Sequence, residues 1–413
     1  MNTEARGSWV EAEVAIVGGG MVGAALGALL VRQARIDPSR VVVLERERPQ
    51  AAVAGSAFDL RVSAVSRASE RILRVAGAWP LLDAARVAPY QSMRVWHEGG
   101  APDRLDALCF DAAAMAERDL GAIIENRNLQ VAALQAFEAG GGRLVPETLQ
   151  DITPQPDAVL LRTSGPTIRA RLVVGADGAS SRVREAAGIA STARDYGERA
   201  IVATLGCELP HGATAWQVFL PTGPLALLPL ADGHCSLVWS AIDDEASRLL
   251  ALDESAFNVA LTRASARVLG SLQLVSERRA FPLRRMTADR FVAGRCVLVG
   301  DAAHTIHPLA GQGVNQGLLD AAALCEAIAD RPPREDPAAP RLLRRYERER
   351  RAGNAVVGAV MDQLDAAFRG PPGVTGRIVR EGFGWVARSR ALREALTRHA
   401  LGLSGDLPRY ARG

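Results

Sequence analysis

The sequence contains no lysine, so all 49 of its basic residues are arginine. They are nearly balanced by 46 acidic residues, which leaves a formal net charge of +3. Proteins that bind nucleic acid need a clear basic excess to neutralise phosphates. We therefore expect no nucleic-acid partner and interpret the arginine usage as a feature of overall composition.

Cysteine is also scarce. The five cysteines are scattered, and no two have the spacing C-x-x-C. An odd, scattered set argues against a disulfide framework and a zinc site, and it indicates a reducing compartment. The first residues lack the basic and apolar regions of a secretory signal peptide. These absences predict a cytoplasmic protein.

One uncharged apolar stretch, residues 14–31, has about the minimum length for a membrane span. Three consecutive glycines at 18–20, with Glu11 and Glu13 just before, argue against that interpretation. The chain has 413 residues, of which 48% are hydrophobic and 23% charged. These values are ordinary for a globular protein with two or three domains.

The same stretch carries the clearest motif. Gly18, Gly20 and Gly23 fit G-x-G-x-x-G between an apolar run that predicts a strand and a run that predicts a helix. In dinucleotide-binding units these glycines allow a tight turn, close approach of a pyrophosphate and close helix packing. Glu45 ends the next predicted strand, where an acid can accept hydrogen bonds from a ribose. A plain βαβ unit, with glycines used only for packing, is the alternative.

Two later units share the order strand, glycine, acid. Asp177 follows Gly175, with Gly178 next, and Asp301 follows Gly300. In a parallel sheet such acids lie at the carboxyl edge of the strands, where ligands bind. Helix capping is the alternative for each aspartate. Their occurrence after a G-x-G-x-x-G unit favours the ligand interpretation.

A second glycine loop, Gly311-Gln312-Gly313, precedes another predicted helix. Its free N–H groups could face a ring that gains negative charge on reduction, with a simple capped turn as the alternative. His304-x-x-His307 could suggest metal, but Pro308 breaks the helix that would align the pair, and no third ligand stands nearby. We find no nucleophile elbow, so a cofactor should supply the chemistry.

With these motifs the chain resembles the single-component FAD-dependent aromatic hydroxylases of the p-hydroxybenzoate hydroxylase fold. Within that family it is similar to the ubiquinone-biosynthesis hydroxylases (the UbiH/UbiI/UbiF group). The three glycine–acid motifs carry the wider resemblance. The narrower one rests on Asp59-Leu-Arg61-Val-Ser-Ala64, Ile124-Glu125-Asn126, the run 304–315 and Ala400-Leu-Gly-Leu403. Many relatives have arginine where this chain has Asn126, and the neighbouring Arg127 is a candidate for that role.

The resemblance implies a role for each matching residue. Gly18, Gly20 and Gly23 would hold the FAD pyrophosphate, and Glu45 the adenosine ribose. Asp177 and Gly178 would serve both FAD and the nicotinamide reductant. The other implied cofactor-binding residues are Arg61 and Gln130 beside the flavin and ribityl chain, Asp301 at the ribityl–pyrophosphate region, and Gly311, Gly313, Val314 and Asn315 over the flavin ring. His304, His307 and Pro308 would lie near the flavin, in a structural role rather than as bases.

The resemblance also implies an α/β fold in which a Rossmann-like FAD-binding domain is interleaved with a β-sheet substrate domain, followed by a helical C-terminus. The predicted FAD-binding segments are 1–80, 106–190 and 286–330. The substrate domain would comprise 81–105 and 191–285, with a β meander over 200–240 and a helix over 243–268. Residues 331–413 would form the helical region.

The implied reaction is hydroxylation of a prenylated phenol with NAD(P)H and O₂ through a flavin C4a-hydroperoxide. The absence of arginine between Thr204 and Ser240 favours an apolar substrate over an aromatic acid. A hydroxylase of another aromatic compound and a flavin-binding assembly subunit remain alternatives. The arginine-rich stretch 374–403 predicts peripheral contact with the inner membrane or with other ubiquinone-biosynthesis proteins. A C-terminal helix that packs on the flavin domain, with a solvated outer face, is the alternative.

Overall fold

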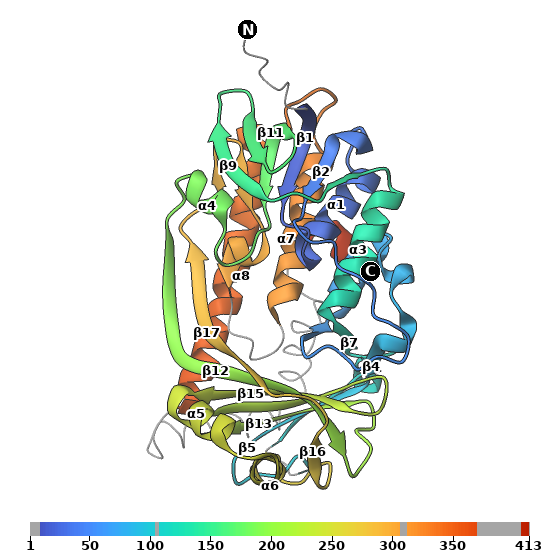
Figure 1. The fold of residues 1–413 in the computed structure, drawn as a ribbon, viewed down its shortest axis with the longest axis vertical. Helices are drawn as coiled ribbons and strands as arrows, with labels where there is room; N and C mark the ends of the chain where they lie inside the picture. The colour runs from blue at the N-terminus through green and yellow to red at the C-terminus, as the bar shows by residue number, and fades with distance from the viewer. Residues whose placement is uncertain (1–8, 104–106, 306–311, 370–405, 413) are drawn as a thin grey trace.

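A computed structural model describes residues 9–103, 107–305, 312–369 and 406–412 (Figure 1). Its first layer is a sheet ordered β18-β19-β11-β1-β2-β8, in which β10 pairs with β11 and β9 with β10. The four central strands and β8 run parallel. The strands are β1 (Trp9–Val17), β2 (Val41–Leu44), β8 (Arg143–Val145), β9 (Leu149–Pro154), β10 (Val159–Thr163), β11 (Thr167–Gly175), β18 (Val292–Ala293) and β19 (Cys296–Leu298).

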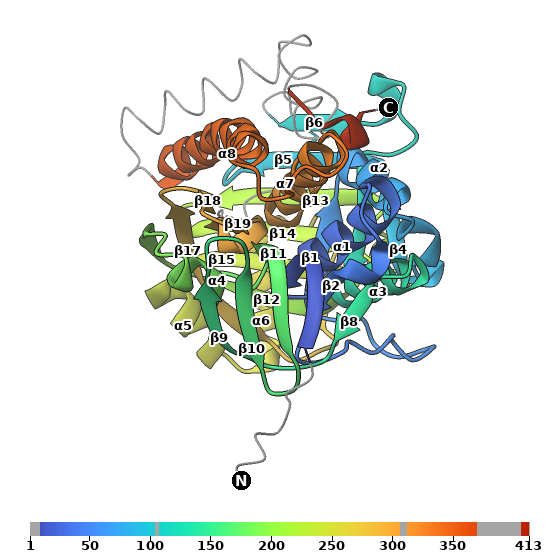
Figure 2. The ribbon, with the colours of Figure 1, turned by 90° about the horizontal axis from the view of Figure 1, so that it is seen from above.

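Helices α1 (Met21–Gln33), α7 (Gln312–Ala329) and α8 (Pro340–Arg369) gather on one face of this sheet (Figure 2). Helix α3 (Asn126–Ala139) packs beside α1, and the short α4 (Arg182–Ala186) follows β11. Close packing needs a residue without a side chain at Gly27, because a Cβ there would lie 3.0 Å from atoms of both Phe137 and Val43. The continuous apolar strands are therefore buried as a parallel sheet requires.

The second layer is a nine-stranded, mostly antiparallel sheet ordered β20-β17-β12-β15-β14-β13-β5-β6, with β16 paired to β12. Helices α5 (Asp243–Ala251) and α6 (Glu254–Ala264) lie against its far face (Figure 1). Its strands are β5 (Ser92–His97), β6 (Leu108–Asp111), β12 (Ser191–Cys207), β13 (Thr214–Leu220), β14 (Gly223–Pro229), β15 (Cys235–Ile242), β16 (Leu272–Leu274), β17 (Arg279–Ala288) and β20 (His304–Thr305).

A long two-stranded ribbon joins the two layers. Strands β12 and β17 pair from Ser191 opposite Ala288 down to Val202 opposite Arg279, with a register shift between Asp195 and Arg199. Figure 1 shows both strands rising from the second sheet beside α8 toward the first layer. A small sheet of β3 (Val62–Val65), β7 (Gly121–Glu125) and β4 (Val87–Tyr90) completes the fold, and α2 (Arg67–Val75) follows β3.

The predicted α/β class and the meander over 200–240 are confirmed. The single helix predicted over 243–268 is wrong, because α5 ends at Ala251 and Leu252 is extended. The Asp253 side chain then accepts a hydrogen bond from the Ala256 N–H at 2.7 Å and begins α6. Asp253, which the predicted single helix would contain, is therefore the N-cap of α6.

The predicted division into FAD-binding and substrate parts stays a proposal. Strand β6, which the sequence assigned to the FAD-binding part, pairs with β5 in the second sheet, so we propose moving the boundary at 106 past Asp111. The part of the chain that the structure describes contains no helix long and apolar enough to cross a membrane. The arginine-rich stretch 374–403 lies outside the described residues.

Candidate active site

The turn between β1 and α1 leaves no room for side chains at two of its glycines. Gly18 has a φ of +101°, and a Cβ there would lie 2.4 Å from the Ala176 carbonyl oxygen. A Cβ at Gly23 would lie 1.9 Å from the Gly18 carbonyl oxygen. Both positions therefore require glycine for the turn and for helix packing.

Gly20 differs from its neighbours because a Cβ built there meets no heavy atom within 4 Å. It is the N-cap of α1, and no side chain caps that helix end. The first N–H groups of α1 thus face open space at the positive end of a 13-residue helix. This cradle fits the diphosphate of a dinucleotide.

Two other predicted cofactor residues hold the middle of this turn. A Glu45 carboxylate oxygen accepts a hydrogen bond from the Gly19 N–H at 2.8 Å. The Gln130 amide donates to the Gly19 carbonyl oxygen at 2.9 Å. The second Glu45 oxygen has only a long contact, 3.4 Å, from the Glu47 N–H, so it keeps acceptor capacity for a ribose hydroxyl.

Asp177 has the hydrogen bonds of a helix cap. One carboxylate oxygen accepts from the N–H groups of Arg182 and Val183 at 2.7 and 3.2 Å, and the other accepts from the Ser181 hydroxyl. These are the hydrogen bonds that the helix-capping alternative predicts for Asp177. Gly178 has a φ of +81° with open space beside it. A cofactor role for the pair stays a prediction.

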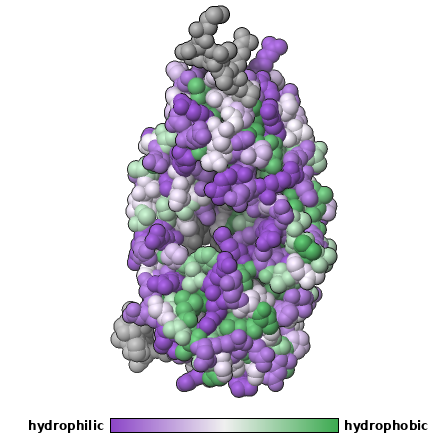
Figure 3. All heavy atoms as spheres, viewed as in Figure 1, coloured by the Kyte–Doolittle hydropathy of each residue, from purple (hydrophilic) through white to green (hydrophobic). Residues whose placement is uncertain are grey.

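Asp301 and Arg61 lie where the two layers meet. Asp301 is in the turn Gly300–Ala302 after β19, and the Arg61 guanidinium lies 5.9 Å from the Phe281 ring centre on β17. The Asp301 carboxyl reaches solvent, yet protein surrounds it on most sides. That desolvation raises its pKa, while His304 and Arg61 act in the opposite direction. Figure 3 shows the surface hollowed at mid-height, between the two layers.

His304 is a buried member of a polar network rather than a free base. Its Nε2 lies 2.6 Å from a carboxylate oxygen of Asp320 on α7, and that same oxygen accepts from the Gly300 N–H at 3.0 Å. Arg350 Nε donates to the other Asp320 oxygen at 2.7 Å. Burial alone would raise the pKa of Asp320, but His304 and Arg350 lower it to about 2.

This network agrees with the structural role favoured for His304. No group of three metal-binding side chains occurs among the described residues. His307, Pro308 and Gly311 lie outside the part of the chain that the structure describes. Sequence patterns missed Asp320 and Arg350, because neither stands beside the glycine motifs that they support.

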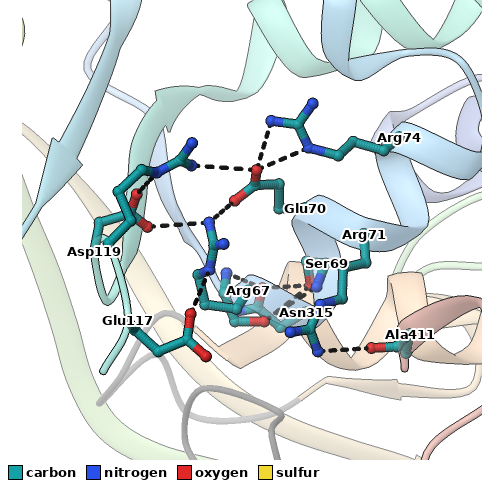
Figure 4. A network of polar contacts seen from close by, with 11 residues as sticks. Arg67, Ser69, Glu70, Arg71, Arg74, Glu117, Asp119, Asn315 and Ala411 are labelled. Atoms are coloured by element: carbon teal, nitrogen blue, oxygen red, sulfur yellow. Dashed lines mark hydrogen bonds and ion pairs between the residues drawn. The ribbon is translucent and has the colours of Figure 1, made fainter. Parts of the chain in front are cut away.

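The start of α7 is fixed by the side chain of Asn315. Its amide oxygen accepts from the Ser66 N–H at 3.0 Å and the Ser69 hydroxyl at 2.7 Å, and its amide nitrogen donates to the Ala64 carbonyl at 2.9 Å. Figure 4 shows Asn315 beside Ser69 at the start of α2. A Cβ at Gly313 would meet only open space. The helix start can thus reach a ligand through its backbone, while the Asn315 side chain is committed to α2.

An ion-pair cluster stabilises the same end of α2. Arg67 pairs with Glu70 and with Asp119, whose carboxylate lies 3.3 Å away (Figure 4). Glu70 also pairs with Arg74 at 2.7 Å. Because Glu70 and Asp119 are almost fully buried, these charges need their partners. The cluster therefore fixes the helix to which Asn315 is attached.

The loop that carries Arg61 is clamped by a buried ion pair. Arg86 donates two hydrogen bonds to Glu125, at 2.5 and 2.8 Å, and two more to the carbonyls of Ser56 and Ala57. Glu125 also accepts from the Asp59 N–H at 2.6 Å. Arg127, the candidate for the role of the arginine that many relatives have, pairs with Asp59 at 2.6 Å. Its side chain thus has a structural partner in this loop.

Comparisons with known proteins agree with this geometry. The family described as FAD binding domain matches residues 11–362. Among solved structures, Pseudomonas aeruginosa PqsL in complex with 2-aminobenzoylacetate superposes with a TM-score of 0.75 at 24% identity, over 92% of this chain and 100% of that one. The p-nitrophenol 4-monooxygenase PnpA from Pseudomonas putida gives a TM-score of 0.74 at 21% identity, over 95% and 98%. These structures share the fold.

Two curated relatives indicate a more specific class of protein within this fold. Ubiquinone hydroxylase UbiL of Rhodospirillum rubrum is 39% identical, over 97% of this chain and 93% of that protein. The 3-demethoxyubiquinol 3-hydroxylase of Escherichia coli is 38% identical, over 95% and 98%. The chain therefore belongs to the family of FAD-dependent aromatic hydroxylases that contains these ubiquinone-biosynthesis enzymes. The predicted resemblance, the FAD cofactor and the enzyme class are confirmed.

Proposed function

We propose that this protein hydroxylates the ring of a prenylated phenol in ubiquinone biosynthesis, with FAD as resident cofactor, O₂ as oxygen source and NAD(P)H as reductant. The observation that carries the proposal is the open space at Gly20, where the N–H groups of α1 can hold a phosphate. The match of the FAD binding domain family to residues 11–362 supports it. The names of the two curated hydroxylases support the substrate class.

Bound FAD would supply the redox chemistry that transfers one oxygen atom from O₂ to the ring. The residues of the chain itself would bind the cofactor and orient the reactants. The α1 N–H groups beside Gly20 would hold the diphosphate, and Glu45 would accept hydrogen bonds from the adenosine ribose. Asp301 and Arg61 would lie beside the flavin end, between the layers. Alignment of reactants and exclusion of water are the protein's contribution to the rate.

An apolar substrate suits the second sheet. Between Thr204 and Ser240 the sequence has no arginine that could pair with a substrate carboxylate. A hydroxylase of aromatic acids would need a buried cation there, since an unpaired carboxylate is costly to bury. This absence favours a neutral phenol with a prenyl tail over a soluble aromatic acid.

We expect the purified FAD-bound protein to oxidise NAD(P)H rapidly only when a short-tail prenylated phenol is present. Mass spectrometry should then detect a product that has gained one oxygen atom. A benzoate of similar size is the control and should stimulate little oxidation. NAD(P)H oxidation that no phenol accelerates, with no oxygenated product, would favour the alternative of a flavin-binding assembly subunit.

We further propose weak contact with an anionic membrane surface or with other proteins of the same pathway. A prenylated phenol partitions into the bilayer, and residues 374–403 carry six arginines against two glutamates. The full-length protein should co-sediment with anionic vesicles at low salt and dissociate at high salt. Equal co-sedimentation with neutral vesicles would contradict an electrostatic contact.

A further inference from the structure

The face of the second sheet that is turned toward the first layer can be read from its strand register. Val95, Gln217, Ala226, Val238 and Val202 are successive partners across β5, β13, β14, β15 and β12. Partners in adjacent strands point to the same face of a sheet. These five side chains therefore form one row across the sheet.

This row lies on the side opposite to α5 and α6. The alternating residues Trp216, Val218 and Leu225 belong to the core that packs under those helices. Ala215 and Leu228, on the same face as the row, instead cluster with residues such as Ile123 of β7. The row thus faces the FAD-binding layer, which lies above the sheet in Figure 1.

The row is apolar except for Gln217. Ala226 and Val238 are only half-buried, so this face is not closed by packing alone. Gln217 as a whole residue is 6% exposed. Among the described residues its amide has no hydrogen-bond partner, and it is not one of the side-chain groups that are sealed from solvent. On the same face the Ser236 hydroxyl is fully buried and also lacks a partner.

The Gln217 amide, unlike the Ser236 hydroxyl, is therefore not closed off from solvent, and its hydrogen-bonding groups are available to a ligand. Binding sites often show this pattern, with a few polar groups placed on an apolar wall to fix the orientation of a ligand. An amide can donate and accept, so it suits a neutral hydroxyl better than a carboxylate.

We infer that Gln217 is a specificity-determining residue that hydrogen-bonds an oxygen substituent of the substrate ring. The inference deepens the proposed function and rests on it for the nature of the ring. Ala226 and Val238 would contact the apolar part of the same substrate. Gln217 would thus discriminate a phenol from an unsubstituted ring by leaving its amide unpaired when no oxygen is present.

The test compares Gln217→Leu with the wild type, both loaded with FAD. The probes are 2-prenylphenol and prenylbenzene, whose binding is followed by perturbation of the flavin absorbance. We expect the variant to bind the phenol about tenfold more weakly, the typical effect of one lost hydrogen bond. Its affinity for prenylbenzene should be unchanged or higher, and its melting temperature equal or higher than that of the wild type.

Gln150→Leu is a matched control, since Gln150 is an exposed glutamine on β9. This variant should bind both probes as the wild type does. Gln217→Asn keeps the amide and should restore part of the preference for the phenol. A Gln217→Leu protein that melts lower and binds both probes equally less well would show that Gln217 is structural, and the inference would be overturned.

The binding readout separates this inference from the proposed function. If the wild type binds the phenol through Gln217 but produces no oxygenated product, hydroxylation fails and the contact stands. If the wild type hydroxylates the phenol and Gln217→Leu retains the full preference for it over prenylbenzene, the function stands and the role of Gln217 fails.

Discussion

Gly20→Val should give a folded but colourless protein. The backbone of Gly20, with φ −63° and ψ −179°, is open to any residue, and a Cβ there touches no protein atom. The valine methyls would instead fill the space in front of the α1 N–H groups. Such overpacking against a bound diphosphate should weaken FAD by roughly tenfold to a hundredfold.

Absorbance of the purified protein and chromatography of the flavin released on heating measure this effect. The wild type should release FAD and not FMN. Gly23→Val is the contrasting variant, because its Cβ would collide with the Gly18 carbonyl at 1.9 Å and should prevent normal folding. If Gly20→Val keeps its full flavin content, the diphosphate does not bind at this helix.

Asp320→Ala should be among the most destabilising single substitutions in the described part of the chain. It would leave the Arg350 guanidinium buried without its carboxylate and would free the Gly300 N–H below the Asp301 turn. Removing one partner of a buried ion pair typically costs about 3–5 kcal/mol. Chemical denaturation of the FAD-free protein measures the change directly.

Asp330→Ala is the matched control. Asp330 pairs with Arg345 and Arg409 at the surface, and exposed pairs contribute about 0–1 kcal/mol.

The dependence of stability on acidic pH is a second measurement of the role of Asp320. Since the pKa of Asp320 falls from 3.8 to about 2 on folding, its contribution is present above pH 3.8 and is lost as the pH falls toward 2. Asp320→Asn should show a shallower loss of stability over that interval, and equal losses would contradict the role of this carboxylate.

The sequence predicts those parts of the site that are local in the chain. The Gly18–Gly23 turn and Glu45 lie within one strand–helix–strand unit, so spacing alone places them together. The β meander is likewise marked by short apolar runs and turn pairs. These predictions depend on neighbours along the chain.

The roles of the remaining site residues could not be predicted, because they depend on contacts with residues that are distant in the chain. Asn315 is predicted to bind the cofactor, and only the structure shows that its side-chain oxygen also accepts a hydrogen bond from the Ser66 N–H, 249 positions away in the chain. Arg86 and Glu125 stand in no motif and become a clamp only when β4 pairs with β7. Asp177 could bind a ligand or cap a helix, and only the structure shows that it accepts hydrogen bonds from the N–H groups of Arg182 and Val183.

The ribbon of β12 and β17 fixes the distance between the first layer, which contains the Gly18–Gly23 turn, and the second sheet. At its upper end the Asp289 N–H donates to the Ala190 carbonyl and continues the pairing of the two strands, and the Ala288 N–H donates to the Ala303 carbonyl, just beyond the turn that follows β19. One added residue would lengthen a strand by about 3.4 Å and turn every later side chain to the opposite face. If the substrate ring binds between the layers as proposed, room for a larger ring must therefore come from smaller side chains on the sheet, or from matched two-residue insertions in both strands.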